Sequence, residues 1–366
     1  MKKISYIDSL RGIAILMVLV IHTIQSVGGL PVWFYDLGRI GKYGVQLFFV
    51  MSAYTLCLSK SFRSDEHKGN LKYFIRRYFR IAPLYYIGIL VYGIVFLFRY
   101  KYDLNTYLLN PDYSFGAVFS HFTFTHGLFP SFIHSVVQGG WSIGTEMLFY
   151  ASFPFLFYFY SKIKIKKLLI LIPISVMFLV FLFFRILPHL FPPISNHDFE
   201  FYYCSILNQL PVFLIGMSLF FFPSTFEFSK RVALFSLFIF ILMIGLMIYI
   251  TRLGFNDITL YPFFAGGSFV FLFIAVKNLE FLNSKLIQMI GRLSFSMYIF
   301  HFLFAWWVSS YFNQVLTGYL NSYFIYLICI LTTIIGSVII ASMSKYFIED
   351  NGIKIGSLII KRIKNK

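Results

Sequence analysis

Residues 8–22 read D-S-L-R-G-I-A-I-L-M-V-L-V-I-H, and this apolar run with its flanks is long enough to cross a membrane as a helix. Arg11 and His22 interrupt the run, eleven residues apart. On an ideal helix that spacing turns through about 1100°, so the side chains lie within about 20° of one face and roughly 16 Å apart along the axis. Ionisable groups in a spanning helix usually face a protein interior or a wet cavity. We therefore expect this helix face to line a site.

The composition of the whole chain is that of a membrane protein. Of its 366 residues, 59% are hydrophobic and only 12% are charged, and the mean hydropathy is +0.77. These values lie far from those of soluble domains and exclude a soluble multidomain protein. The cysteines at 57, 204 and 329 fall in apolar segments without metal-ligand spacing, and we expect them to pack as small hydrophobic side chains.

The predicted fold class is all-α, a polytopic transmembrane bundle of about ten spanning helices. The spanning candidates are residues 7–27, 41–59, 78–98, 141–160, 167–187, 202–222, 232–250, 260–277, 290–311 and 323–346. We expect a membrane domain over residues 1–347 and a basic cytoplasmic tail over residues 348–366.

Lysine and arginine residues are spread unevenly over the predicted loops. With a cytoplasmic N-terminus, the inside segments hold about four times as many of them as the outside segments. This bias predicts that both termini are cytoplasmic. It also attributes the net charge of +17 to topology and to contact with membrane lipid, so no nucleic-acid partner is expected.

Two arginines at the end of a basic cytoplasmic stretch are candidates for phosphate binding. Arg77 and Arg80 are spaced i, i+3 and share a helix face. Guanidinium forks suit bidentate contacts with phosphate better than ammonium groups do. The alternative is ordinary positive-inside charge, which already explains cations at this position.

Glu146 is the acidic residue that lies well inside a predicted spanning segment, just after Trp141 and Ser142. We expect it about five residues, roughly 8 Å, below the outer surface, at a depth similar to that of His22. A carboxylate beside an imidazole raises its basicity and fixes its tautomer. The alternative is a structural carboxylate that is hydrogen-bonded to serine or tryptophan groups.

Other histidines carry weaker signals. The long outer loop from about residue 99 to 140 holds His121, His126 and His134, and loops of this length are often functional. Their spacing matches no metal motif, so we expect no metal site. His301 is predicted near the membrane midplane, either at the site or as a satisfied core residue. We expect Ser52, in the second segment, to serve helix packing.

These stretches together resemble the acyltransferase 3 family of integral membrane acyltransferases, over most of the chain from residue 6 to residue 301. The residues that carry the resemblance are Tyr6-Ile7-Asp8-Ser9-Leu10-Arg11-Gly12 with His22, the run Gly44 to Ser52, Arg77-x-x-Arg80, Trp141-Ser142 with Glu146, and Leu293-Ser294-Phe295-Ser296-Met297-Tyr298 with His301. One departure is Ala53, where the family usually has glycine. The chain is expected to be a stand-alone member without the secreted hydrolase-like domain of some relatives.

The resemblance implies an O-acetyltransferase in the bacterial cytoplasmic (inner) membrane. The donor would be cytoplasmic acetyl-CoA, or another acyl-CoA, and no metal would be needed. The acceptor would be a sugar hydroxyl of a surface polysaccharide, such as O-antigen of lipopolysaccharide, capsule or exopolysaccharide, or its lipid-linked precursor.

Roles for the residues follow from the resemblance and from their positions. His22 would be the general base, or less favourably a covalent acyl carrier, and Glu146 would orient it or bind the sugar. Arg11 would hold the coenzyme or stabilise negative charge, and Arg77 and Arg80 would bind its phosphates. Trp141, Ser142 and His301 are the expected substrate-binding residues.

The rival interpretation is a transporter, for example a flippase of a lipid-linked sugar. Buried ionisable groups would then mark a substrate or proton path. The sequence shows no convincing internal repeat of the kind found in many transporters. Binding of coenzyme A discriminates between the two, because a flippase needs no acyl thioester.

Overall fold

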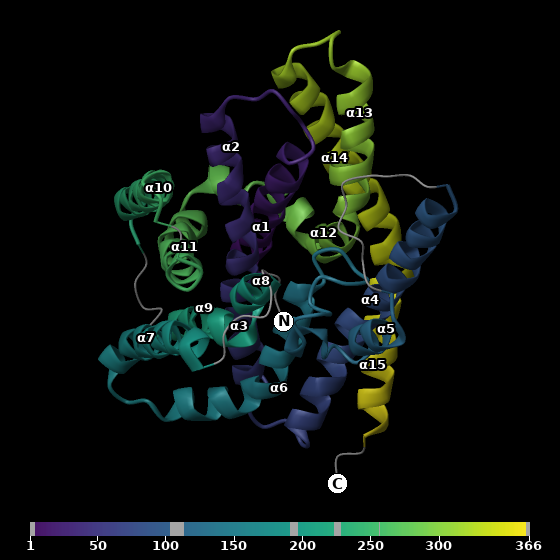
Figure 1. Cartoon of the computed structure of the whole chain (residues 1–366). Helices are drawn as coiled ribbons and strands as arrows, with labels where there is room; N and C mark the ends of the chain where they lie inside the picture. The colour runs from purple at the N-terminus through teal and green to yellow at the C-terminus, as the bar shows by residue number, and fades with distance from the viewer. Residues whose placement is uncertain (1–3, 103–112, 191–196, 223–227, 256, 364–366) are drawn as a thin grey trace.

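The protein is mostly helical in its described part, as a computed structural model shows (Figure 1). The structure describes residues 4–102, 113–190, 197–222, 228–255 and 257–363. Within these ranges there is no β-strand, and Thr317 and Leu320 form an isolated bridge between two helices. The predicted all-α class is confirmed.

The described residues form a series of α-helices along the chain. They are α1 (Ser5–Ile24), α2 (Val32–Arg39), α3 (Gly44–Ser61), α4 (Gly69–Tyr102), α5 (Phe115–Phe122), α6 (Trp141–Lys162), α7 (Lys166–Leu190), α8 (His197–Cys204), α9 (Ile206–Phe221), α10 (Lys230–Arg252), α11 (Leu260–Asn278), α12 (Lys285–Phe302), α13 (Ser309–Leu316), α14 (Ser322–Ser344) and α15 (Asp350–Arg362). Short 3-10 turns are η1 (Ile40–Tyr43), η2 (His126–Leu128) and η3 (Glu280–Asn283), and π-helical turns are η4 (Leu303–Val308) and η5 (Lys345–Glu349).

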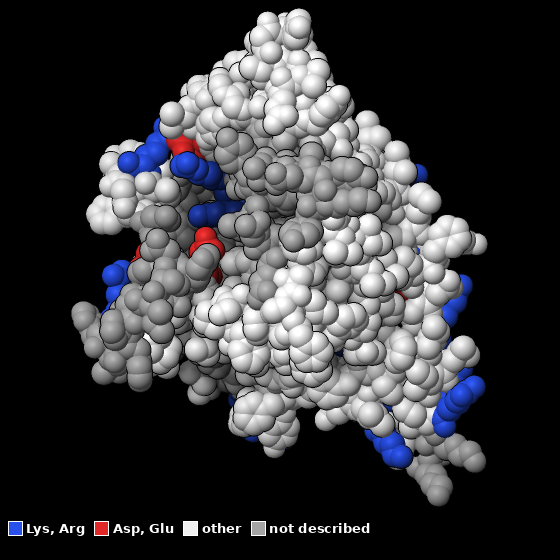
Figure 2. All heavy atoms as spheres, turned by 45° about the vertical axis from the view of Figure 1, so that its right-hand side comes forward, with Lys and Arg blue, Asp and Glu red and all other residues white. Residues whose placement is uncertain are grey.

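Eight helices or continuous helical stretches of the described chain are long and apolar enough to cross a membrane. They contain α1, α4, α7, α9, α10, α11, α12 with α13, and α14 with α15. The other two predicted segments, 41–59 and 141–160, are the helices α3 and α6, which carry polar residues along their length. The broad central face in Figure 2 is largely free of charged side chains, as a lipid-facing surface requires.

Helix α1 lies at the centre of the bundle and packs against α12, α3 and α14. Its contact with α12 is backbone to backbone. A Cβ atom on Gly291 would lie 1.7 Å from the carbonyl oxygen of Asp8, and one on Gly12 would lie 2.3 Å from that of Ile287. Small residues permit this approach, and it brings the face of α1 that carries Arg11 directly against α12.

Helices α3 and α9 pack with similar closeness. A Cβ on Gly216 would lie 2.2 Å from the carbonyl oxygen of Val50 and 2.9 Å from the Cβ of Ala53. The close approach near Ala53 is therefore provided by the glycine of the partner helix. Gln46 donates to Gln209 (3.0 Å) across the same buried contact, which fixes the register of the two helices.

The segment before α6 differs from the expected outer loop. Within residues 113–140, Ala117, His121, His126, Val136 and Val137 are completely buried. The segment therefore folds back into the protein (Figure 1), and α6 begins inside the bundle. Its backbone is paired by local turns, which is the condition for placing non-helical chain at membrane depth.

The C-terminal region is helical beyond the predicted membrane domain. Helix α14 continues through the π-helical turn η5 into α15, so the helix runs across residue 347. Gly352 and Gly356 of α15 lie against Phe79 of α4, and a Cβ on Gly352 would meet the Phe79 carbonyl oxygen at 2.6 Å. Residues 350–362 of the expected tail are therefore packed on the bundle, while the division of the chain at residue 347 stays a prediction.

Candidate active site

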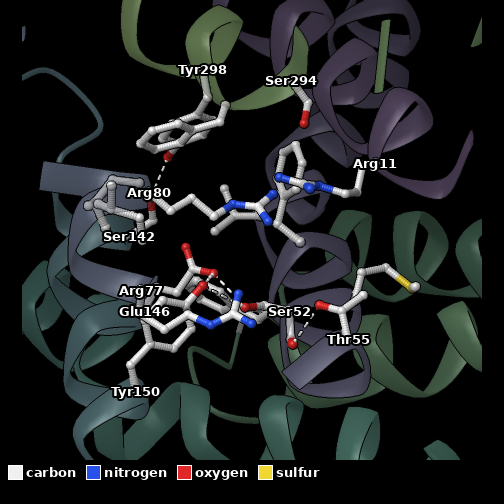
Figure 3. A pocket seen from close by; sticks show the side chains of 17 residues that line it. Arg11, Ser52, Thr55, Arg77, Arg80, Ser142, Glu146, Tyr150, Ser294 and Tyr298 are labelled. Carbon is white, nitrogen blue, oxygen red and sulfur yellow. Dashed lines mark hydrogen bonds between the residues drawn. The ribbon is translucent and has the colours of Figure 1, made fainter. Parts of the chain in front are cut away.

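A cavity lies between α1, α3, α4, α6 and α12 (Figure 3). Its empty volume is about 690 Å³, including the part that is open to solvent. The residues that line it are Arg11, Val45, Phe48, Phe49, Met51, Ser52, Thr55, Arg77, Arg80, Ile81, Ser142, Ile143, Glu146, Tyr150, Ser294, Phe295 and Tyr298. Segments far apart in the sequence thus meet at one place, and the walls combine apolar surface with a few polar groups, as in most small-molecule sites.

The structure brings Arg11, Arg77 and Arg80 together in this cavity. Figure 3 shows the guanidinium groups of Arg11 and Arg80 pointing toward one another from opposite sides, with Arg77 beneath them. None of the three forms an ion pair within the described residues, and the Nε of Arg77 is buried without a hydrogen-bond partner. Their neighbour Arg76, in contrast, is held by Glu66 at 2.6 Å.

Glu146 is the acidic residue among those that line the cavity. Its carboxylate accepts a hydrogen bond from Ser52 (2.5 Å) and a second, very short one from Tyr150. Three guanidiniums and one carboxylate leave the cavity with a formal charge of +2, counted from its lining residues. A cavity of this charge, whose arginine forks form no ion pair among the described residues, is suited to an anionic ligand such as a phosphate.

Tyr298 and Ser142 form the side of the cavity opposite Tyr150 (Figure 3). Ser142 Oγ donates to the Tyr298 hydroxyl at 2.7 Å, and that hydroxyl donates to the carbonyl oxygen of Gly139 at 3.1 Å. Trp141 is not among the lining residues; its ring contacts Phe49 at 6.2 Å between centroids.

His22 and His301 form a second cluster next to the cavity. Their ring centroids are 5.1 Å apart, and the His22 ring also lies 4.3 Å from Phe302 and 5.9 Å from Trp306. His301 Nδ1 donates to the carbonyl oxygen of Tyr298 (2.7 Å), and its buried Nε2 has no hydrogen-bond partner. His301 is therefore neutral with its lone pair on Nε2.

Tyr298 connects the two clusters, because it lines the cavity and its ring lies 5.6 Å from that of His301. The structure thus places five of the predicted residues in one cavity, namely Arg11, Arg77, Arg80, Ser142 and Glu146, and two beside it, His22 and His301.

The expected contact between Glu146 and His22 is not made. Glu146 is bonded to Ser52 and Tyr150, and Nδ1 of His22 lies 3.3 Å from the side-chain oxygen of Gln25. The reason is the buried segment before α6: since α6 begins inside the bundle, the distance of Glu146 from an outer loop does not set its position relative to His22.

Sequence reasoning missed two parts of the carboxylate site. It assigned Ser52 to packing and overlooked Tyr150, yet both hydroxyls donate to Glu146. Tyr150 follows Glu146 by four residues, so the shared helix face was a readable signal. Among the described residues, no group of three or more His, Cys, Asp or Glu side chains is arranged to hold a metal ion.

Comparison with protein families identifies the family of the chain. The family model of acyltransferase 3, described as an acyltransferase domain, matches residues 4–342. The matched part therefore contains every residue of the cavity and both histidines. Comparison with curated proteins and with solved structures gives no match.

Proposed function

Because the chain belongs to the acyltransferase 3 family and is a multi-pass membrane acyltransferase, we propose that it transfers an acetyl group from acetyl-CoA to a sugar hydroxyl. The acceptor is a surface polysaccharide or its lipid-linked precursor, on the far side of the bacterial inner membrane from the donor. The observation that carries this proposal is the convergence of three arginines without an ion pair among the described residues in one cavity, next to a pair of imidazoles.

Arg11, Arg77 and Arg80 are the residues that bind the phosphates of the donor. Their formal charge exceeds that of Glu146 by two, and no carboxylate competes for them as Glu66 does for Arg76. Each charge-assisted hydrogen bond from a guanidinium to a phosphate stabilises a complex by about 1.5–3 kcal/mol. The acyl thioester supplies the activated carbonyl carbon, which no residue of the chain provides.

His22 is the general base of the transfer. Its imidazole takes the proton of the acceptor hydroxyl as the hydroxyl oxygen forms a bond to the thioester carbonyl carbon. The carbon–sulfur bond then breaks, and His22 returns the proton to the departing sulfur. The helical rise from Arg11 to His22, about 16 Å for eleven residues, lets the arginines and the base act on opposite ends of one extended donor.

The membrane orientation predicted from the lysine and arginine bias agrees with this direction of transfer. Cytoplasmic termini place the start of α4, with Arg77 and Arg80, toward the cytoplasm, where acyl-CoA is made. His22 lies in the last turn of α1, toward the other face. Donor and acceptor therefore approach from opposite sides and meet near Tyr298 and the imidazole pair.

The proposal is tested in membrane vesicles that carry the protein and receive acetyl-CoA labelled in the acetyl group. We expect alkali-labile label on polysaccharide or lipid-linked sugar with the wild type, and none with His22→Ala at equal abundance. Matched vesicles carrying His67→Ala, a change in the loop between α3 and α4, control for the loss of a histidine. Full transfer by His22→Ala would refute the assignment of His22 as the general base. No transfer by the wild type would favour the transporter interpretation.

A further inference from the structure

We propose that Tyr85, His121 and His126 form a clamp that positions the first turn of α6, and with it Ser142 and Glu146, for acyl transfer. These residues have no part in the mechanism above and none was expected at the site. The inference deepens the proposed function, and for its catalytic consequence it rests on that function.

The three side chains are completely buried and contact one another. The imidazole rings of His121 and His126 are stacked, with centroids 3.9 Å apart and planes inclined by 8°. The Tyr85 hydroxyl lies 2.7 Å from His121 Nδ1 and 3.4 Å from His126 Nε2. Helix α4, which carries Tyr85, is thereby joined to α5, which carries His121, and to η2, which begins at His126.

The hydrogen-bond partners fix every proton in the clamp. His126 Nε2 faces the carbonyl oxygen of Gly140 at 3.0 Å, so this nitrogen must donate. Ser135 Oγ donates its own proton to the carbonyl oxygen of Phe132 at 2.7 Å, so it accepts from His121 Nε2 at 3.1 Å, and Tyr85 donates to the remaining lone pair on His121 Nδ1. Burial lowers the pKa of His121 to about 2, with a further contribution from His126, and burial also lowers the pKa of His126. Both rings are therefore neutral donors of fixed direction.

The carbonyl oxygen that His126 binds belongs to Gly140, the N-cap residue of α6. Gly140 O also accepts the amides of Ile143 (3.0 Å) and Gly144 (3.1 Å), which begin the helix. The helix fits closely against the ring, because a Cβ on Gly144 would lie 2.6 Å from His126 Nε2. A shift of His126 is therefore transmitted directly to the backbone of the first turn.

The turn is also held from the other side. Tyr298, which lines the cavity, donates to the carbonyl oxygen of Gly139. Gly139 adopts φ +72, a conformation that glycine accepts readily. The adjacent carbonyl oxygens of Gly140 and Gly139 thus accept hydrogen bonds from His126 and from Tyr298 of α12. Ser142 and Glu146 follow within two turns of the helix.

Apolar side chains alone could bury the segment before α6, so burial does not by itself require the polar groups of the clamp. Burying three polar side chains costs free energy unless each hydrogen bond is made, and Nδ1 of His126 is buried without a hydrogen-bond partner. The network is therefore suited to fixing direction more than to adding stability. If the first turn of α6 changes its orientation, the Glu146 carboxylate and Ser142 are misplaced. Arg11, Arg77 and Arg80 lie on other helices and keep their positions. The clamp therefore affects turnover more than donor binding.

The test is hydrogen–deuterium exchange of the amides of residues 141–146 in the full-length protein in detergent. Exchange there should be faster in His126→Leu, and near wild type in His126→Gln, whose amide nitrogen replaces the donor. Tyr85→Phe keeps the ring and removes one hydroxyl, so it should give a smaller increase in the same amides. Thr123→Val, an exposed site in the same segment, is the matched control.

Kinetics with acetyl-CoA provide the second readout. For His126→Leu we expect kcat to fall about 10- to 100-fold, with the KM for acetyl-CoA within twofold of wild type and kcat restored in His126→Gln. Unchanged exchange at residues 141–146 in both His126→Leu and Tyr85→Phe overturns the clamp. So does a rise of equal size in all helices. A wild type without transferase activity refutes the proposed function, while the exchange result still decides the clamp.

Discussion

The contact between α1 and α12 offers a sharp perturbation of the site. A Cβ on Gly291 would lie 1.7 Å from the carbonyl oxygen of Asp8 and 2.6 Å from its carbonyl carbon. Ordinary van der Waals contact begins at 3.4 Å. In Gly291→Ala the two backbones must therefore separate by about 1.7 Å, the difference between these two distances, since a backbone carbonyl cannot rotate away as a side chain can.

This separation acts on the cavity. Arg11 follows Asp8 by three residues, and Ser294 follows Gly291 by three, so two adjacent walls of the site, on α1 and α12, move apart. Misplacement of catalytic groups by 1 Å can cost about 100-fold in rate, and overpacking typically costs about 1–3 kcal/mol in stability. We expect Gly291→Ala to lose at least about 100-fold in acetyl transfer and to melt at a lower temperature.

The assay is labelled-acetyl transfer by purified protein at equal amounts of folded enzyme, with thermal melting in parallel. The matched control is Gly245→Ala in α10, where a Cβ would meet nothing within 4 Å. It should keep wild-type activity. Wild-type transfer and melting by Gly291→Ala would show that α1 and α12 are not locked together at this point, and the reasoning would be refuted.

Two further predictions concern the carboxylate and the buried segment. Tyr150→Phe removes one of the hydrogen-bond donors to Glu146. Because a hydrogen bond to a charged group is worth about 1.5–3 kcal/mol, steady-state kinetics should show kcat/KM lower by about 10- to 150-fold. A change in kcat/KM below twofold contradicts this expectation. His121 has a folded-state pKa of about 2, below its unfolded value, so its contribution to stability is complete above pH 6.5 and is lost as pH falls below it. His121→Gln should therefore lose less stability than wild type between pH 7 and pH 5 in urea unfolding, and parallel losses would contradict the neutral ring.

Much of the lining of the cavity could be predicted from the sequence. The i, i+3 spacing of Arg77 and Arg80 predicted a shared face, and both side chains line the cavity with Arg11. Helical periodicity carries this information because the residues lie on regular, continuous helices. The same reasoning anticipated the all-α bundle, although eight stretches satisfy length and apolarity and α3 and α6 have a more polar character.

The position of Glu146 relative to His22 was beyond the sequence. It depended on the position of the first turn of α6 inside the bundle. The preceding residues 113–140 contain no apolar run of spanning length, so they were assigned to an outer loop. Only the partners of His121 and His126 in the folded protein show that this segment is buried. Tertiary hydrogen bonds between distant helices leave no periodic signal, so the depth of a buried connection is hard to read from one chain.

Binding of coenzyme A to the purified protein, measured by calorimetry, tests the central claim most directly. Arg77→Gln should bind about 10- to 150-fold more weakly than wild type, from the loss of a charge-assisted contact worth about 1.5–3 kcal/mol. Arg76→Gln changes the adjacent arginine, which is held by Glu66 outside the cavity, and should bind within twofold of wild type. Equal affinity of wild type and Arg77→Gln, or no binding by the wild type, would contradict the assignment of this cavity to the acyl donor.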